Sequence, residues 1–90
     1  MKTPLLLTLE VAETMLEPYS EWSAVVLCER HGVSVATLKR YIADLRHMGA
    51  RIIVRGGGKN PWFYRLDNAE QCQKTVRAWL RLERERTLIA

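Results

Sequence analysis

The chain has 90 residues, of which 48% are hydrophobic and 27% charged, and its net charge is +4. This length and balance indicate a single soluble domain with one modest core, and they exclude a disordered chain. The apolar run near the start, Leu5–Leu7, is too short for a signal peptide or a membrane span. We therefore expect a cytoplasmic protein that has no membrane partner.

The basic residues concentrate in the middle of the chain. Residues 1–29 carry one Lys and five Glu, whereas residues 30–65 carry eight Lys or Arg and a single acid, Asp44. Residues 66–90 are nearly balanced, with five basic and four acidic residues. Like charge concentrated in one segment attracts a polyanion and speeds the encounter with it. The middle third is therefore a candidate polyanion-binding surface, and a solvated basic face without a partner is the alternative.

Two helices are predicted in the first third of the chain. Over residues 4–16 apolar side chains recur at helical spacing, and Pro4 suits the first helical position. A second helix is predicted over residues 21–31, with Ser20 as its N-cap and Gly32 closing it. The apolar residues of the second helix point in nearly all directions around its axis. Such a helix must be covered on more than one side.

A third helix is predicted over residues 34–48, with Ser34 as its N-cap and Gly49 at its end. Only the three residues "GVS" separate it from the second helix, which is the spacing of a helix-turn-helix. One side of this helix is apolar and is expected to face the core. The other side is basic, with small residues between the long ones. Its members are Ala36, Arg40, Ala43 and His47, flanked by Thr37, Lys39 and Asp44.

Residues 51–66 predict a β-hairpin, because "RIIVR" and "WFYRL" are β-rich runs joined by "GGGKNP". A nucleotide-binding phosphate loop would need Gly where Ile53 stands, Ser or Thr where Asn60 stands, and a helix afterwards. The glycines are therefore interpreted as the turn at the tip of the hairpin. The charged and polar residues expected at this tip and beside it are Arg55, Lys59, Asn60 and Arg65.

A last helix is predicted over residues 69–88, with Asn68 as its N-cap and Gln71 as a capping-box partner. Its apolar stripe consists of Cys72, Val76, Trp79 and Leu80. This stripe can cover helix 21–31 or form the seam of a dimer. We expect the first half of the stripe to pack within the chain, and Trp79 and Leu80 to contact a second copy. Beyond residue 82 the sequence is too polar for burial, so its end is expected to project into solvent or onto that copy.

The order helix, helix, tight turn, helix, hairpin, helix predicts a winged helix-turn-helix. Residues 1–90 would form a single α+β, mostly helical domain with three helices, a two-stranded wing hairpin and one C-terminal helix. The major groove of B-DNA admits one α-helix, and the second helix of the motif enters it. Residues 34–48 would thus be a recognition helix, and residues 55–61 a wing on the DNA backbone. The predicted DNA-binding residues are Ser34, Ala36, Thr37, Lys39, Arg40, Ala43, His47, Arg55, Lys59, Asn60 and Arg65.

The stretch "GVSVATLKRYIADLRHMGARI" resembles the N-terminal DNA-binding domain of DeoR-type bacterial regulators. The resemblance covers about residues 5–66 and extends to "FYRL" at the end of the hairpin. It departs at His31, where the family usually has Leu, and at Phe63, where Gly is common. No effector domain of that family follows, so metabolite sensing is not expected. The resemblance implies a winged helix that binds DNA, with contacts from Ser34, Thr37, Lys39 and Arg40.

No catalytic residue, metal site or cofactor is predicted. Cys28 and Cys72 are far apart and have no metal-binding spacing, and a reduced cytosolic protein is expected. The sequence predicts a sequence-specific double-stranded DNA-binding protein, a small phage or bacterial transcriptional regulator that acts as a homodimer. One alternative is a protein-interaction module, such as a phage-encoded inhibitor or assembly factor, which docks through Trp22 and Val26 or through the C-terminal helix. An excisionase-like architectural DNA-binding factor is another.

Overall fold

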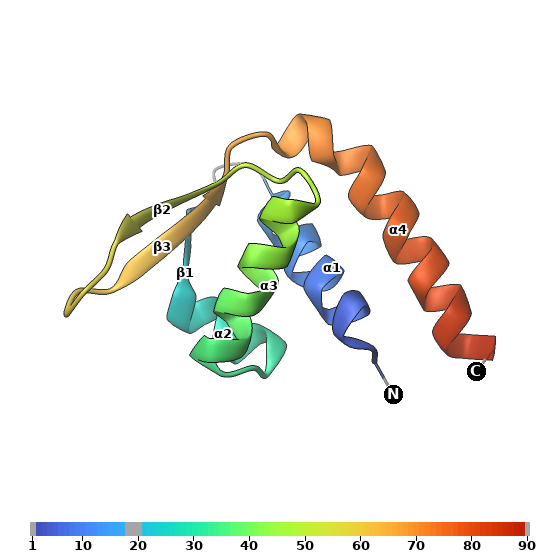
Figure 1. The fold of residues 1–90 in the computed structure, drawn as a ribbon, viewed down its shortest axis with the longest axis horizontal. Coiled ribbons are helices and arrows are strands. Elements are labelled where there is room, and N and C mark those ends of the chain that lie inside the picture. The colour runs from blue at the N-terminus through green and yellow to red at the C-terminus, as the bar shows by residue number, and fades with distance from the viewer. Residues whose placement is uncertain (1, 18–20, 90) are drawn as a thin grey trace.

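The computed structural model describes residues 2–17 and 21–89 of the chain. Within these residues the fold consists of four helices and a three-stranded antiparallel sheet, and β2 and β3 project away from the helices as a wing (Figure 1). This arrangement is the α+β winged-helix layout that the sequence predicts. In chain order the elements are α1 (Pro4–Met15), β1 (Glu21–Ser23), α2 (Ala24–His31), α3 (Val35–His47), β2 (Ile52–Gly56), β3 (Trp62–Leu66) and α4 (Ala69–Ile89).

Helices α1, α2 and α3 bury their apolar sides in one core. Leu9, Leu27 and Leu38 each contribute a buried side chain from a different helix. Ile52 of β2 and Tyr64 of β3 extend the core to the base of the wing. Full burial of a leucine stabilises a fold by about 1.5–3 kcal/mol relative to leaving it exposed. The inner side of α3 is therefore held by packing, and its opposite side is left exposed.

The second predicted helix is too long at its start. Residues 21–23 form β1, which pairs antiparallel with β3 and places Trp22 opposite Tyr64. The wing sheet consequently has three strands in the order β1-β3-β2, where two were predicted. Helix α2 begins only after Ser23, and the predicted cap Ser20 lies outside the described residues. Local periodicity could not reveal β1, because its partner strand lies some forty residues away along the chain.

The apolar side of α4 lies along α1 and does not cover α2 (Figure 1). Val76 and Leu80 belong to the buried core. Leu80 is 1% exposed, so it is not available to a second copy as predicted, whereas Trp79 is 44% exposed. Val25 and Val26 of α2 remain exposed to solvent. An apolar stripe shows that a helix face must be buried, but the path of the chain after β3 decides which helix it meets.

Beyond residue 82 the end of α4 is mostly exposed, as predicted, but Glu83 is an exception and is only 4% exposed. Its carboxylate accepts hydrogen bonds from the Thr3 hydroxyl at 3.4 Å and from the Arg86 guanidinium at 2.9 Å. The next residue, Arg84, donates to Glu13 of α1 at 3.3 Å. A buried carboxylate is tolerated when it is hydrogen-bonded and paired. Polar and charged side chains near the end of α4 therefore contact both α1 and its N-cap Thr3.

Asn68 was predicted to cap the last helix. Its side chain instead contacts the turn between α3 and β2 as well as the start of α4. Its Oδ1 atom accepts from the Arg51 backbone N–H at 2.8 Å, and its Nδ2 atom donates to the Gly49 carbonyl at 3.0 Å. Nδ2 also lies 3.4 Å from Oε1 of the predicted partner Gln71. Both polar atoms of Asn68 thus bind the turn between α3 and β2. This contact fixes the start of α4 relative to the end of α3.

His31 ends α2 and packs against α1. Its Nε2 atom lies 3.0 Å from the hydroxyl of Thr14. Burial lowers the pKa of this imidazole, Glu10 opposes that effect, and Arg30 and Lys2 reinforce it. His31, where the sequence differs from the family pattern, therefore packs at the end of α2, and the fold favours its neutral imidazole.

We expect acid to destabilise the protein partly through His31. The unfolded chain binds a proton at His31 at a higher pH than the folded chain does, so the free energy of unfolding falls as pH drops through the ordinary imidazole range. Urea unfolding at about pH 7.5 and about pH 5.5 measures this loss, which His31→Gln should reduce. An equal pH dependence in wild type and His31→Gln would contradict this prediction.

Candidate nucleic-acid interface

The start of α3 has a cap that leaves its N-terminus open to solvent. The Ser34 hydroxyl accepts from the Thr37 backbone N–H at 3.2 Å and donates to the Thr37 hydroxyl at 3.0 Å. Backbone N–H groups and the helix dipole favour an anion at such a terminus. Ser34 is the N-cap that the sequence predicts. Both residues therefore lie at a helix terminus that favours an anion.

The exposed side of α3 has two basic edges with small residues between them. Lys39 and Arg46 line the edge next to the wing. Arg40 and His47 line the other edge, next to the start of α1, together with Asp44. Ala36 and Ala43 are exposed between these edges. The predicted contact residues of the helix thus share one surface, and its alanines allow a close approach of the backbone to another molecule.

A groove of about 410 Å³ separates α3 from the inner face of the wing. The Lys39 ammonium lies 5.3 Å from the ring centre of Trp62, whose indole N–H donates to the Tyr64 hydroxyl at 2.9 Å. The guanidinium of Arg46 donates to the Ile52 carbonyl at 2.9 Å, which ties α3 to the base of the wing. The groove has no acidic residue among its lining side chains, and its two charged ones are basic. Its electrostatics therefore favour an anionic ligand.

The outer face of the wing is less basic than the sequence indicates. Arg55 forms a two-bond ion pair with the carboxylate of Glu21, at 2.6 and 2.7 Å, and stacks on Phe63 with 4.6 Å to the ring centre. The bond from Arg55 is the main reason that the pKa of Glu21 is lowered. Arg65 lies 3.5 Å from Asp67. Two of the four predicted wing contacts are therefore already engaged by acids of the same chain.

The tip of the wing carries the remaining predicted contacts. Lys59 and Asn60 are both exposed, and the Asn60 backbone N–H donates to the Gly57 carbonyl at 3.1 Å. Lys59 has no ion pair within the described part of the chain. Gly56 has φ 89°, and a Cβ there would lie 2.4 Å from the Pro61 carbonyl oxygen. A glycine is thus required at the point where the hairpin narrows toward its tip.

Sequence reasoning missed three residues of this surface. Arg46 stands seven positions after Lys39, which is two helical turns, so the helical pattern contained the signal. Trp62 was not among the predicted contacts, although its ring lies beside the Lys39 ammonium in the groove. Glu21 carried no local signal, because β1 was not predicted. No ion pair of the described residues includes Asp44, the acid on the outer side of α3.

Other kinds of site find no support in the described part of the chain. No cluster of three or more His, Cys, Asp or Glu residues is placed to hold a metal ion there. None of the described helices has the length and apolar character needed to cross a membrane. Cys28 and Cys72 are both free, and burial raises the pKa of each thiol. No protein-family model, curated protein or solved structure matches this chain.

Proposed function

We propose that the protein binds double-stranded DNA with sequence preference and acts in the cytoplasm as a small, non-enzymatic transcriptional regulator. The observation that carries the proposal is the surface formed by α3 and the wing. A capped helix exposes a basic side with small central residues, and a groove with only basic charges separates it from a projecting hairpin. The major groove, about 12 Å wide, accepts a helix of this kind.

Each predicted contact has a distinct role in this proposal. Ser34 and Thr37 bind a phosphate at the helix N-terminus. Arg40 and His47 reach base edges, since both are exposed on the outer side of α3. Lys59 contacts the backbone from the wing tip. Phosphate contacts of this kind position the protein, whereas base contacts select the sequence.

Selection from a random pool of duplexes tests the proposal directly. We expect enrichment of one sequence, and a fluorescence-anisotropy titration should show tighter binding to it than to random duplex. Affinity for both should fall steeply with salt, because bound phosphates release counterions. Absence of binding to any duplex at low salt would refute the proposal.

Lys59→Ala is expected to weaken binding to the selected duplex and to random duplex by similar factors. The lysine at the tip neutralises a phosphate and reads no base, so its loss should lower the slope of log affinity against log salt by about one. Arg77→Ala on α4 removes the same charge from a different element and should leave both quantities unchanged. A change in base preference with Lys59→Ala would contradict its assignment to the backbone.

A second candidate function is docking to another protein through α2. Val25 and Val26 are 55% and 44% exposed, and Arg30 lies 5.2 Å from the ring centre of Trp22 beside them. Winged helices also act as interaction modules, since a fold does not determine a function. A stable protein complex that Val26→Lys abolishes, with no duplex affinity at low salt, would favour this function.

An architectural role, in which the protein bends DNA, is a third candidate. It differs from regulation in its outcome, and a circular-permutation assay separates the two.

A further inference from the structure

The outer face of the wing carries an acid beside two arginines. The sheet register places Glu21 of β1 opposite Arg65 of β3, and Phe63 of β3 opposite Arg55 of β2. Residues paired in an antiparallel sheet project from the same face, and successive residues of a strand project from opposite faces. Tyr64, between Phe63 and Arg65, lines the groove beside α3. The acid and the two arginines therefore lie on the face turned away from that groove.

The Arg55 side chain crosses the whole sheet to reach Glu21. β1 and β2 are the two edge strands, with β3 between them, so the backbones that carry the two residues are two strand spacings apart, about 10 Å in all. The guanidinium lies over the ring of Phe63 and donates to both carboxylate oxygens, at 2.6 and 2.7 Å. Glu21 is paired nearer the base of the wing than Phe63 is. Arg55 is thus held back from the tip of the wing.

The contact between Arg55 and Glu21 has the geometry of a contact between arginine and phosphate. A carboxylate and a phosphate each present two oxygens that accept parallel hydrogen bonds from one guanidinium. The hydrogen bond from Arg55 is the main cause that lowers the pKa of Glu21, so the carboxylate is an anion at neutral pH. Both side chains are exposed, so a phosphate of another molecule can approach them. Glu21 therefore occupies the place on Arg55 that two phosphate oxygens would take.

The charges around this ion pair favour a competing phosphate. The charged side chains of the wing and its base are Glu21, Asp67, Arg51, Arg55, Lys59 and Arg65. Asp67 lies 3.5 Å from Arg65, so of the two acids only Glu21 contacts Arg55. Lys59 at the tip has no ion pair among the described residues. A DNA backbone held at Lys59 would present its neighbouring phosphates to Arg55 at a high effective concentration.

We propose that Glu21 is an internal competitor of DNA, whose carboxylate occupies the phosphate site of Arg55 in the free protein and is displaced by a backbone phosphate when DNA binds. This inference rests on the proposed DNA-binding function and adds to it a residue that sets the affinity. Because one anion replaces another, Arg55 contributes only the difference between its two ion pairs. Glu21 therefore weakens the binding of the wing to any duplex.

Glu21→Gln tests the competition. It should raise the affinity for the selected duplex and for random duplex alike, by about threefold to fivefold, which is the scale of an exposed ion pair. The slope of log affinity against log salt should become steeper by up to about one, because Arg55 gains a full charge for the phosphates. Anisotropy titrations at several salt concentrations measure both quantities.

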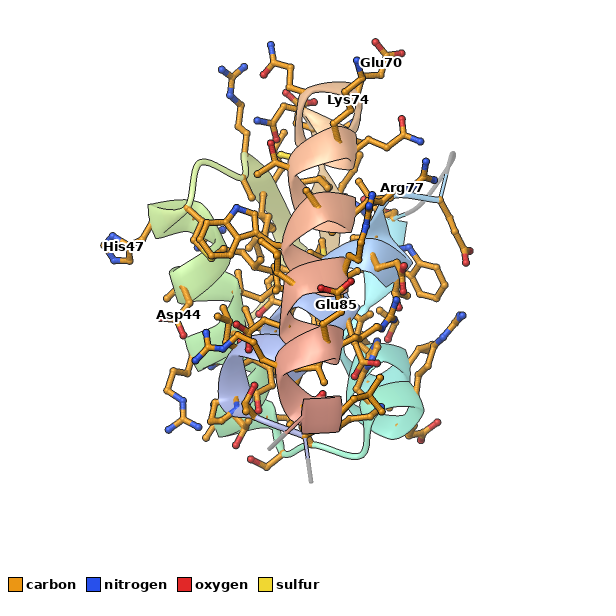
Figure 2. All side chains as sticks on the ribbon, turned by 90° about the vertical axis from the view of Figure 1, so that its right-hand side faces the viewer. Asp44, His47, Glu70, Lys74, Arg77 and Glu85 are labelled. Carbon is orange, nitrogen blue, oxygen red and sulfur yellow. The ribbon has the colours of Figure 1, made fainter. Side chains whose placement is uncertain are left out.

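Glu85→Gln is the matched control, because it removes the same charge from α4. Glu85 lies on the side of the molecule that Figure 2 presents, and Figure 1 shows the wing at the opposite side. This variant should leave affinity and salt slope unchanged, since salt screens a charge so far from the duplex. Amide hydrogen exchange of β1 and β3 establishes that the sheet is intact in Glu21→Gln. A Glu21→Gln protein that binds duplex no more tightly than Glu85→Gln would overturn the proposal.

A second background separates competition for Arg55 from simple charge repulsion. In Arg55→Gln the further change Glu21→Gln should give a much smaller gain in affinity, because only Arg65 is left to benefit. An equal gain in both backgrounds would mean that Glu21 acts through its charge alone, and it would overturn the proposal.

The wild-type protein allows a test that needs no variant. When duplex is added, the NMR signal of the Glu21 carboxyl carbon should move together with that of the Arg55 Nε–H group, as the carboxylate loses its partner. Duplex binding that leaves the Glu21 signal unchanged would show that the carboxylate is not displaced, and it would overturn the proposal.

The anion site and the DNA-binding function can fail independently. Inorganic pyrophosphate is a probe of the site without DNA, and it should shift the Arg55 Nε–H signal of Glu21→Gln at lower concentration than that of wild type. This result without any duplex affinity would refute the proposed function and leave the anion site of Arg55 standing. Duplex binding that is equal in wild type and Glu21→Gln would refute the competition and leave the proposed function standing.

Discussion

Arg40→Ala is expected to lower the affinity for the selected duplex by about tenfold to a hundredfold and to relax the base preference at one position. A guanidinium that forms two parallel hydrogen bonds with guanine contributes about 1–3 kcal/mol of discrimination. Arg40 is exposed on the outer side of α3 and has no ion pair among the described residues, so its donors are available. Anisotropy titrations against the selected duplex and its single-base variants measure both effects.

Arg77→Ala is the matched control for this experiment. It removes the same side chain and the same charge from α4, so any loss caused by net charge alone would appear in both variants. We expect Arg77→Ala to bind within about twofold of wild type, because loss of a charge far from the duplex is screened by salt. If Arg40→Ala weakened binding to all duplexes equally, Arg40 would be a phosphate contact. If it changed nothing, α3 would not be the recognition helix.

Gly56→Ala is expected to destabilise the wing more than any other single-methyl addition in the hairpin. A left-handed backbone conformation costs a residue with a Cβ about 1–2 kcal/mol. The added methyl group would also lie 2.4 Å from the Pro61 carbonyl oxygen. That oxygen belongs to the backbone immediately before β3, so relief requires the hairpin to open, and overpacking of this kind costs about 1–3 kcal/mol more. Amide hydrogen exchange of β2 and β3 should show lost protection, and affinity for all duplexes should fall.

Gly58→Ala separates the cost of the left-handed conformation from the cost of the contact with Pro61. Gly58 has φ 64°, and an added Cβ there has no atom within 4 Å. This variant therefore meets only the cost of the left-handed conformation, and it should retain protection of β2 and β3 and most of the duplex affinity. Equal effects of the two variants would mean that the contact with Pro61 is unimportant for the wing.

The wing contributes less free charge than its composition suggests. Arg55 and Arg65 are paired with Glu21 and Asp67, whereas Lys59 at the tip and Lys39 in the groove have no ion pair among the described residues. Exposed ion pairs of this kind are weak, so a phosphate can compete for either arginine. The charge count of a segment thus overstates its electrostatic attraction when acids from elsewhere in the chain lie beside it.

The amino-acid sequence by itself determined the order of the helices and the hairpin, and it placed most of their boundaries within one residue. Caps, turn glycines and apolar periodicity act over a few residues, so they can be read without knowledge of the rest of the chain. Ser34 shows this most clearly, because its hydroxyl caps α3 as predicted. The basic outer side of α3 followed from the same local pattern, since the buried side of a helix specifies its exposed side.

Only the tertiary structure decided which segments meet. Residues 21–23 became β1 because β3 offered them a partner, and this strand brought Glu21 to Arg55. Leu80 was buried and Trp79 left exposed because α4 packs along α1, and Glu83 found its hydrogen-bond partner Thr3 there. Each of these outcomes depends on residues tens of positions apart. Whether such residues contact one another depends on the folded path of the chain, and a local sequence pattern carries no information about that path.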